Sequence, residues 1–426
     1  MPRRNLQLLF GIGLLSILCY QKVQNNRYSE ALVKAFDLIQ RRYLEPVGGA
    51  TLFEGAVKGM VDRLDPNSAY FTAANYQEFI ESIEQEFAGV GMEVSVDPQT
   101  KQLTVVSPLV DSPAYKAGIL AGDKILAIDG RSTLGIALEN TVQLMRGPTG
   151  SSVVLSVLHA GQPKPIDVTI VRAVIQVDSV QGDTRNADGT WNFFLQGFDR
   201  IGYLRINSFG DKTAQEMAAA MQKLRADHLR GLILDLRNDP GGRLDAAVAV
   251  CDMFINAGVI VTTRSRGGQI KQTYEAQAKA DFREFPLAVL VNRHSASASE
   301  IVAACLQDHH RSVIVGERTF GKGTVQELLE WPDNLGALKL TTASYWRPSN
   351  RNINKPKDAD VSADWGVIPD PGYQVVVDDD ELTRWFRWRI ERDGRRHNAS
   401  GDTPDPKVIA DAPLLKALEF LEKAVK

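Results

Sequence analysis

Cysteine is scarce in this sequence, and neither sign of charge is in excess. Three cysteines occur among 426 residues, and they form no Cys-x-x-Cys pair, which argues against a zinc ribbon and requires no disulfide. Lys and Arg number 49 against 52 Asp and Glu, so the net charge of −3 gives no reason to expect nucleic acid as a partner. Hydrophobic residues at 44% and charged residues at 24% are ordinary for soluble globular protein, which excludes wholesale disorder, collagen and a multi-span membrane protein.

Several motifs of hydrolytic enzymes are also absent. Without GxSxG or GNSGG, an α/β-hydrolase elbow and a chymotrypsin-type site are disfavoured, and neither HExxH of zinc proteases nor a GxxxxGK[ST] phosphate loop occurs. Of the six histidines, five have no catalytic context. His294 is near Ser297 but in the adjoining turn, where the geometry for a Ser-His pair is unfavourable. We therefore expect no metal site and no cofactor.

The N-terminus has the pattern of an export signal. Arg3 and Arg4 precede an apolar stretch from Leu6 to Tyr20, a basic start with a short apolar core. The stretch is marginal for a spanning helix, which needs about 20 residues, and no A-x-A cleavage site follows. A cleaved signal, an uncleaved anchor and a buried helix all stay open. We expect a protein exported to the cell envelope or periplasm, with an N-terminus able to associate with the membrane.

The remaining chain divides into regions of different periodicity, and its length suggests about two to four domains. The predicted parts are a signal or anchor segment at 1–26, a helical region at 27–82, a module of strands with two short helices at 83–175, an alternating strand–helix core at 176–349, and loops with helices at 350–426. Such alternation predicts a mixed α/β multidomain fold with largely parallel strands in the core. One strand is expected to run through residues 89–96.

Two strand-to-helix turns in the core carry candidate chemistry. A buried strand ends at Asn292, and the next residues lead into a helix that places Ser297 near its N-terminus, where free N–H groups favour developing negative charge. Ser297 with Glu300 also fits a capping box, a purely structural alternative that spacing alone favours. Lys322 lies between two glycines on a tight loop. The turn at 237–242 contains two glycines that either expose N–H groups or simply make the turn.

Several segments of the chain match one family in sequence order. The two strongest are Ser295-Ala296-Ser297-Ala298-Ser299-Glu300-Ile301 and Thr319-Phe320-Gly321-Lys322-Gly323-Thr324-Val325-Gln326, joined by residues 64–71, 89–130, 235–242, 341–346 and 366–370. Together they closely resemble the carboxyl-terminal processing peptidases, or tail-specific proteases. The resemblance covers about residues 28 to 424. It implies a PDZ domain at 83–175 inserted before a crotonase-like α/β peptidase core.

The resemblance also implies roles for individual residues. Ser297 corresponds to the nucleophile, Lys322 to the general base, and Gln326 to the residue that holds the lysine amine. The backbone N–H groups of Ala298 and of the Gly241–Gly242 turn correspond to the oxyanion hole.

Two neighbouring positions are less clear. Asp239 stands where the family usually has asparagine, which puts the charge of the glycine turn in doubt, and the role of Glu300 stays open. A lysine base must be neutral, and lowering its pKa from about 10.4 to about 7 costs roughly 4.6 kcal/mol, which desolvation can supply. We expect Phe320 and the glycines around Lys322 to keep water away from the amine.

The PDZ resemblance implies recognition of substrate tails. Such modules take an extended C-terminal peptide as an added strand and bind its carboxylate through backbone N–H groups. The matching carboxylate loop consists of Gly89, Val90, Gly91 and Met92. From the sequence alone, this loop is a β-turn.

The function implied is that of a serine endopeptidase that cleaves unfolded or tail-bearing proteins of the cell envelope near their C-termini. A PDZ adaptor without catalytic activity, which only holds C-terminal tails, is an alternative that the intact Ser297, Lys322 and Gln326 disfavour. A carrier of small apolar ligands in a related core is a third reading, and it predicts no cleavage.

Overall fold

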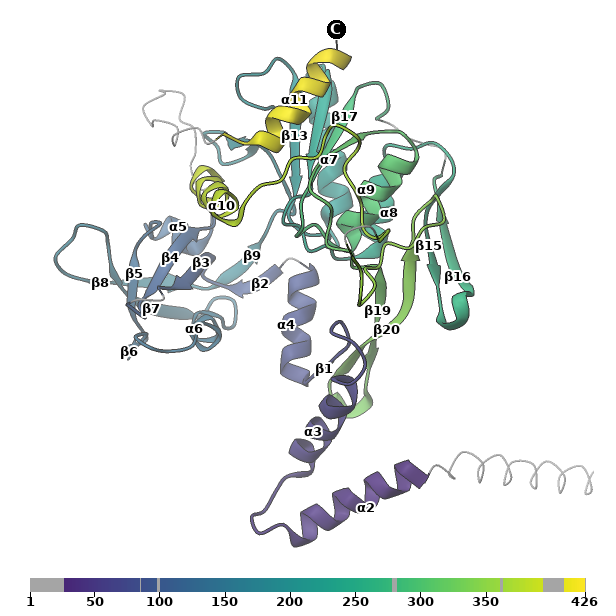
Figure 1. The fold of residues 1–426 in the computed structure, drawn as a ribbon. Coiled ribbons are helices and arrows are strands. Elements are labelled where there is room, and N and C mark those ends of the chain that lie inside the picture. Colours follow the sequence, from purple (N-terminus) through teal and green to yellow (C-terminus); the bar gives the residue numbers. More distant parts are fainter. Residues whose placement is uncertain are drawn as a thin grey trace, which may run out of the picture. The chain divides into compact units, whose positions relative to one another are not determined.

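The computed structural model describes residues 27–84, 86–97, 100–277, 282–360, 363–393 and 410–425 (Figure 1). The chain divides into two compact units. The N-terminal unit comprises the residues up to Ala74 with Glu327–Leu340, and the main unit comprises Asn75–Gln326 with Thr341–Lys426. The predicted signal or anchor segment at 1–26 lies outside the described residues. Within the described ranges, no helix is long and apolar enough to cross a membrane.

The N-terminal unit begins with two helices, α2 (Arg27–Arg42) and α3 (Gly49–Val61). A short strand follows, β1 (Ala69–Phe71), which pairs antiparallel with the start of β20 (Ala337–Trp346). The region at 27–82 was expected to be helical, so this strand differs from the expectation. The strand forms because its backbone pairs with β20, and the ring of Tyr70 packs there against the rings of Phe53 and Trp331 at centroid distances of 6.1 and 5.8 Å.

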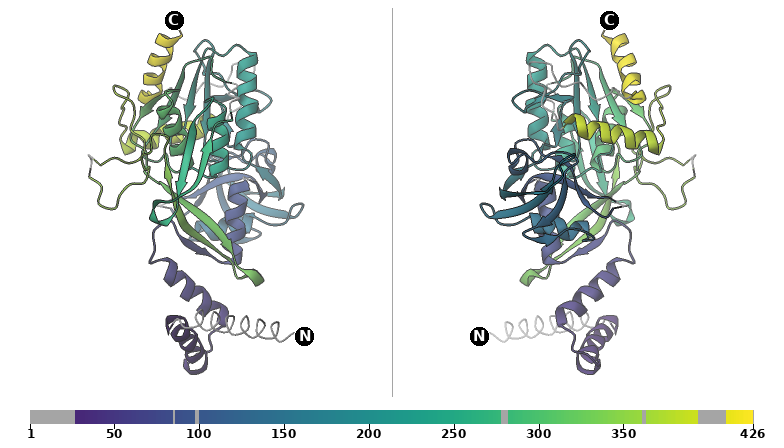
Figure 2. Two further views of the ribbon diagram at one scale, coloured as in Figure 1. Left: turned by 90° about the vertical axis from the view of Figure 1, so that its right-hand side faces the viewer. Right: turned by 90° about the vertical axis from the view of Figure 1, so that its left-hand side faces the viewer.

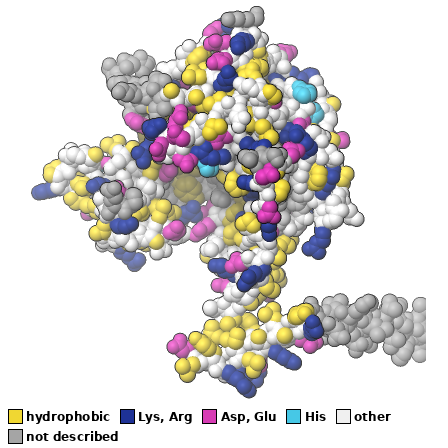
Figure 3. Space-filling model, in the orientation of Figure 1, with side chains coloured by type: hydrophobic (Ala, Val, Ile, Leu, Met, Phe, Trp, Pro, Cys, Tyr) yellow, Lys and Arg dark blue, Asp and Glu magenta, His cyan; other side chains and the backbone are white. Residues whose placement is uncertain are grey.

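The first helix, α2, exposes most of its apolar side chains in this unit. No residue of α2 is buried, and Figure 3 shows hydrophobic side chains gathered on the N-terminal helices. Leu32 and Val33 are among the exposed large residues, and they border an apolar groove of about 630 Å³ that α3 and β20 also line. Helical periodicity thus predicted helix α2 correctly. It did not predict that no face of this helix is buried.

The predicted PDZ module is a small antiparallel sheet with two helices. The sheet has the order β3-β4-β5-β7-β8, and β6 pairs with β5. The elements are β2 (Glu86–Gly89), β3 (Met92–Val96), β4 (Leu103–Pro108), α5 (Pro113–Lys116), β5 (Lys124–Ile128), β6 (Arg131–Ser132), α6 (Leu138–Met145), β7 (Ser152–Leu158), β8 (Ile166–Val171) and β9 (Ala173–Gln176). The strand expected over 89–96 is split, because Gly91 adopts a φ of +77° that turns the chain between β2 and β3. Among the described strands, β3 is an edge strand that pairs with β4 alone.

The core of the main unit is a largely parallel sheet, as predicted. Its order is β10-β13-β14-β17-β18, with all neighbours parallel except β10 and β13. The elements are β10 (Val180–Gln181), β13 (Ile201–Ile206), α7 (Thr213–Ala226), β14 (Gly231–Asp235), α8 (Leu244–Asp252), β17 (Leu287–Val291), α9 (Ala298–Asp308), β18 (Val313–Gly316) and α11 (Ala412–Ala424). Leu232 and Leu234 face a hydrophobic cluster with α7, α8 and α9, while Ile233 faces a second cluster with α11, the yellow closing helix in Figure 2. Both faces of the sheet are therefore covered, which explains its continuous apolar strands.

The main unit contains further elements outside this sheet and the predicted PDZ module. They are α4 (Ala73–Glu84, from Asn75 on), β11 (Thr184–Arg185), β12 (Trp191–Asn192), β15 (Val259–Arg264), β16 (Ile270–Glu275), β19 (Thr324–Glu330, up to Gln326), the end of β20, and α10 (Asp379–Asp393), with short 3-10 turns at Arg266–Gly268 and, in the N-terminal unit, Pro332–Asn334. The hairpin of β15 and β16 pairs with the end of β20. The domain boundaries given above stay predictions.

Candidate active site

Ser297 occupies a strained position at the start of a helix. It follows β17 and is the N-cap of α9, with φ +56° and ψ −113°. A non-glycine residue seldom adopts positive φ, and such strain persists only where the surroundings impose it. Ser297 itself is almost fully buried, with 5% of its surface exposed. The sequence therefore placed this serine at a helix N-terminus correctly, and the structure adds a backbone that presents it in an unusual orientation.

The two flanking serines are engaged elsewhere. The hydroxyl of Ser295 donates to the carbonyl oxygen of Leu236 at 2.7 Å, and that of Ser299 donates to the carbonyl oxygen of Asp239 at 3.1 Å. Both residues are fully buried. Of the three serines in this motif, Ser297 is the one whose hydroxyl is not used to hold the neighbouring glycine turn.

The glycine turn packs directly against the serine loop. A side chain at Gly241 would place its Cβ 2.5 Å from the carbonyl oxygen of Ala296 and 2.8 Å from the Cβ of Ser297, and φ there is +92°. A Cβ at Gly242 would lie 2.1 Å from the carbonyl oxygen of Phe209. Both glycines are therefore required by close approach, beyond the general role of glycine in turns.

The three predicted oxyanion donors differ in their surroundings. Ala298 is the first residue of α9, and the first N–H groups of a helix have no partner within it. Gly242 is exposed. The N–H of Gly241, in contrast, donates to Oδ1 of Asp239 at 2.8 Å. The geometry thus favours Ala298 and Gly242 as donors to a ligand, with Gly241 shaping the turn.

Glu300 joins the serine loop to the lysine loop. Its carboxylate accepts hydrogen bonds from the N–H of Ser297 (2.9 Å), the hydroxyl of Thr319 (2.6 Å), and the N–H groups of Gly321 (2.7 Å) and Lys322 (2.8 Å). Burial raises the pKa of Glu300, and these four donors limit that rise. Four donors and no acceptor suit an ionised carboxylate, which only accepts. The capping interaction foreseen between Ser297 and Glu300 is present, and it also organises the second loop.

The lysine loop is held by close backbone packing. Lys322 is half-buried, and a Cβ at Gly321 would lie 2.7 Å from the indole of Trp365. The expectation that Phe320 shields the amine is wrong, because this side chain is 56% exposed. The amide of Gln326 donates to the hydroxyls of Thr324 (2.8 Å) and Thr341 (3.2 Å). A contact between Gln326 and the lysine amine stays a prediction.

Tyr345 is a site residue that the sequence analysis did not single out. It is buried near the end of β20, its side chain lies beside that of Ser297, and burial raises its pKa to about 12. Its neighbours in sequence had been noted only as part of a core motif, and no spacing rule links it to the serine. His294 is exposed, in agreement with its exclusion as a base.

The carboxylate loop of the predicted PDZ module is fixed from one side. The carbonyl oxygen of Val90 accepts from the N–H of Ala114, and that of Gly91 accepts from the hydroxyl of Ser112 at 2.7 Å. A Cβ at Gly91 would lie 2.3 Å from Cβ of Ser112, so only glycine fits. The loop leads directly into the edge strand β3.

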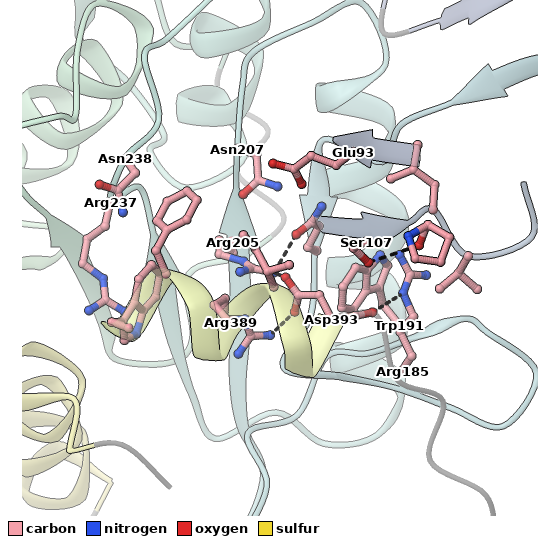
Figure 4. A pocket seen from close by; sticks show the side chains of 17 residues that line it. Glu93, Ser107, Arg185, Trp191, Arg205, Asn207, Arg237, Asn238, Arg389 and Asp393 are labelled. Atoms are coloured by element: carbon pink, nitrogen blue, oxygen red, sulfur yellow. Dashed lines mark hydrogen bonds and ion pairs between the residues drawn. The ribbon is translucent and has the colours of Figure 1, made fainter. Parts of the chain in front are cut away.

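A pocket of about 330 Å³ extends from β3 and β4 to Asn238, the residue before Asp239 in the glycine turn (Figure 4). Arg205, in the middle of this view, donates to Gln181 and Asp393, both at 2.5 Å. The Nε atom of Arg205 and the Nδ2 atom of Asn238 are buried without a hydrogen-bond partner in the described part of the chain. Residues of β3, β4 and the glycine turn thus line one pocket.

Comparison with known proteins identifies three regions. Peptidase family S41 matches residues 200–370, a PDZ domain matches 104–158, and the N-terminal domain of the activating protease CtpB matches 19–74. A carboxy-terminal-processing protease of Bartonella bacilliformis is 38% identical over 401 residues, covering 91% of this chain and 86% of the relative. A carboxyl-terminal-processing protease of Synechocystis is 34% identical, covering 78% and 74%. The solved photosystem II D1 C-terminal processing protease is 27% identical with a TM-score of 0.46, covering 82% of this chain and 92% of that one.

Proposed function

Because the chain belongs to the carboxy-terminal-processing proteases, a family of serine-type peptidases, we propose that it cleaves proteins near their C-termini through a dyad of Ser297 and Lys322. The observation that carries this proposal is the tie made by Glu300. One buried carboxylate holds the backbone N–H of both dyad residues, at 2.9 and 2.8 Å, so hydrogen bonds join the two loops that carry them.

The chemistry follows from this arrangement. The neutral amine of Lys322 takes the proton of the Ser297 hydroxyl as the oxygen attacks the scissile carbonyl carbon, and then gives it to the leaving amine. The oxyanion that forms is stabilised by the N–H groups of Ala298 and Gly242, with the positive end of the α9 dipole behind it. Water then hydrolyses the acyl-enzyme, with Lys322 again as base.

Tail recognition is proposed for the edge strand of the PDZ domain. β3 has one neighbour in its sheet and leaves its other edge for an added strand, and the loop Gly89–Met92 precedes it. We propose that the substrate segment between the bound tail and the scissile bond runs through the pocket of Figure 4, because this pocket is lined by Glu93 of β3 at one end and by Asn238 of the glycine turn at the other.

Export and membrane association are proposed from the N-terminal sequence alone. Arg3 and Arg4 before the apolar stretch Leu6–Tyr20 support delivery to the cell envelope or periplasm. Mass spectrometry of the mature N-terminus would separate a cleaved signal from an anchor.

The dyad is tested with single and double substitutions. Ser297→Ala and Lys322→Ala should each abolish cleavage of an unfolded protein while leaving the folded structure intact, and their effects should not add, because the two residues act as one unit. Ser132→Ala, at an exposed position of β6 outside the motif, is the control and should retain cleavage. Normal cleavage by Ser297→Ala would refute the dyad, and an inert wild-type chain that still binds tails would favour the adaptor.

A further inference from the structure

Asp239 is a buried acid in the glycine turn, and half of its carboxyl group has no partner. The residue is fully buried. Its Oδ1 accepts from the N–H of Gly241 at 2.8 Å, while Oδ2 is buried with no hydrogen bond. Its backbone carbonyl accepts from the N–H of Ala296 (3.0 Å) and from the hydroxyl of Ser299 (3.1 Å). The residue thus connects the turn to the serine loop at two points and braces the turn itself at a third, yet leaves one carboxyl oxygen unused.

No cation compensates this acid. Arg237, from the same turn, is held between two buried carboxylates. On the serine loop, Arg293 pairs with carboxylates elsewhere and His294 is exposed, and on α9 the charged neighbour is Glu300, itself an acid. In the ranges that the structure describes, Asp239 makes no ion pair.

An unpaired buried carboxylate is costly, and the usual response is to keep the proton. Burial raises the pKa of Asp239 well above its ordinary range, and the Gly241 N–H and the nearby Ser299 hydroxyl offset only part of that rise. When protonated, Oδ2 becomes a donor, and the Ser299 oxygen beside it can accept.

We propose that Asp239 is a positioning residue of the oxyanion turn and works as a neutral carboxylic acid. The neutral group holds the Gly241 N–H and fixes the turn so that Gly242 and Ala298 present their N–H groups. Loss of the proton places a negative charge directly behind the position of the developing oxyanion, which opposes its formation. This inference rests on the proposed function for its catalytic half, whereas the protonation of Asp239 stands without it.

Protonation is tested through stability in full-length Ser297→Ala protein, with and without Asp239→Asn. A folded pKa above the unfolded value means that the folded state keeps a proton that the unfolded state releases. Stability is then complete below about pH 4 and is lost as pH rises through the folded pKa, by roughly tenfold in the folding equilibrium constant per pH unit. Asparagine cannot lose that proton. The urea midpoint of Asp239→Asn should therefore exceed that of its parent by a margin that grows with pH.

Asp308→Asn is the matched control, because the pKa of Asp308 is shifted in the opposite direction from that of Asp239. Burial opposes ionisation of Asp308, but hydrogen bonds from Arg347 at 3.0 and 2.7 Å hold its pKa below the ordinary value. Its contribution to stability is present above about pH 4 and disappears at lower pH, so Asp308→Asn should lose stability at neutral pH and recover it in acid. A margin for Asp239→Asn that stays constant with pH, or follows the pattern of Asp308→Asn, would overturn the neutral acid.

The positioning role is tested through the pH profile of cleavage in the otherwise wild-type chain. Near neutral pH, Asp239→Asn should keep kcat/KM within about threefold of wild type, because the amide reproduces both contacts of the neutral acid. Above the pKa of Asp239 the wild type should fall roughly tenfold per pH unit, and Asp239→Asn should not. If wild type and Asp239→Asn lost activity equally at alkaline pH, the positioning role would be overturned. An active Ser297→Ala enzyme would instead refute the dyad, and the stability comparison would still decide the protonation state.

Discussion

Replacing Glu300 by glutamine should uncouple the two catalytic loops. The carboxylate accepts four hydrogen bonds, from Ser297, Thr319, Gly321 and Lys322, whereas the single oxygen of an amide keeps at most two. Two buried donors then face an NH2 group. Hydrogen bonds to a charged group contribute about 1.5–3 kcal/mol each, so the loss is about 3–6 kcal/mol. A neutral amide costs less free energy to bury than an ionised carboxylate, so the expected loss of stability lies near the lower end of this range.

The assay is urea unfolding of Glu300→Gln beside cleavage of an unfolded substrate. A loss of about 3 kcal/mol is a large part of the 5–15 kcal/mol typical of a domain, but it leaves a folded population that can be assayed. In that population kcat should fall more than KM rises, because the serine and lysine backbones shift while the tail site does not. Glu419→Gln, on the exposed side of α11, is the control and should change stability by less than about 0.5 kcal/mol. Wild-type stability and activity in Glu300→Gln would refute the view that this carboxylate holds the site together.

Three further predictions concern the turn, the base and the tail. Gly241→Ala should lower kcat by roughly 100- to 1,000-fold, as expected when an oxyanion hole is disturbed. The reason is that its Cβ would lie 2.5 Å from a backbone oxygen of the serine loop. Steady-state kinetics with a near-normal kcat would contradict this packing. The rate of cleavage should rise with pH as Lys322 loses its proton, with an apparent pKa well below about 10.4. Chelators should have no effect, and His294→Ala should retain most activity. A large loss of activity in folded His294→Ala would revive a Ser-His mechanism. Amidating the substrate C-terminus should weaken binding to full-length Ser297→Ala protein by roughly 10- to 100-fold in calorimetry, since hydrogen bonds to a charged carboxylate are lost, and equal binding of acid and amide would refute carboxylate recognition.

The sequence predicted the parts of the site that depend on local backbone geometry. The serine at the start of α9 and the glycines at 241 and 242 were identified from strand-to-helix turns and from the family resemblance, and the structure brings these two turns into close contact. The parallel core sheet followed from alternating strands and helices, because strands buried on both faces are apolar throughout.

What the sequence did not predict depends on contacts between distant segments. Three of the four hydrogen bonds of Glu300 come from residues 19 to 22 positions away, and Tyr345 reaches the serine from a different sheet. Phe320 was expected to shield the lysine because it is apolar and adjacent, but neighbours in sequence on a tight loop point in different directions, and this ring faces solvent. The short strand β1 within a helical pattern has the same origin, because its partner lies on β20.

The central claim, that Ser297 is acylated with Lys322 as its base, is tested most directly by locating the modified residue. The full-length protein is treated with a fluorophosphonate, digested and sequenced by mass spectrometry, in parallel with Lys322→Ala. Our account predicts a single adduct on Ser297 that forms at a rate rising with pH and that is lost in Lys322→Ala. An adduct on Ser295 or Ser299, or one on Ser297 that forms equally fast without Lys322, would contradict it.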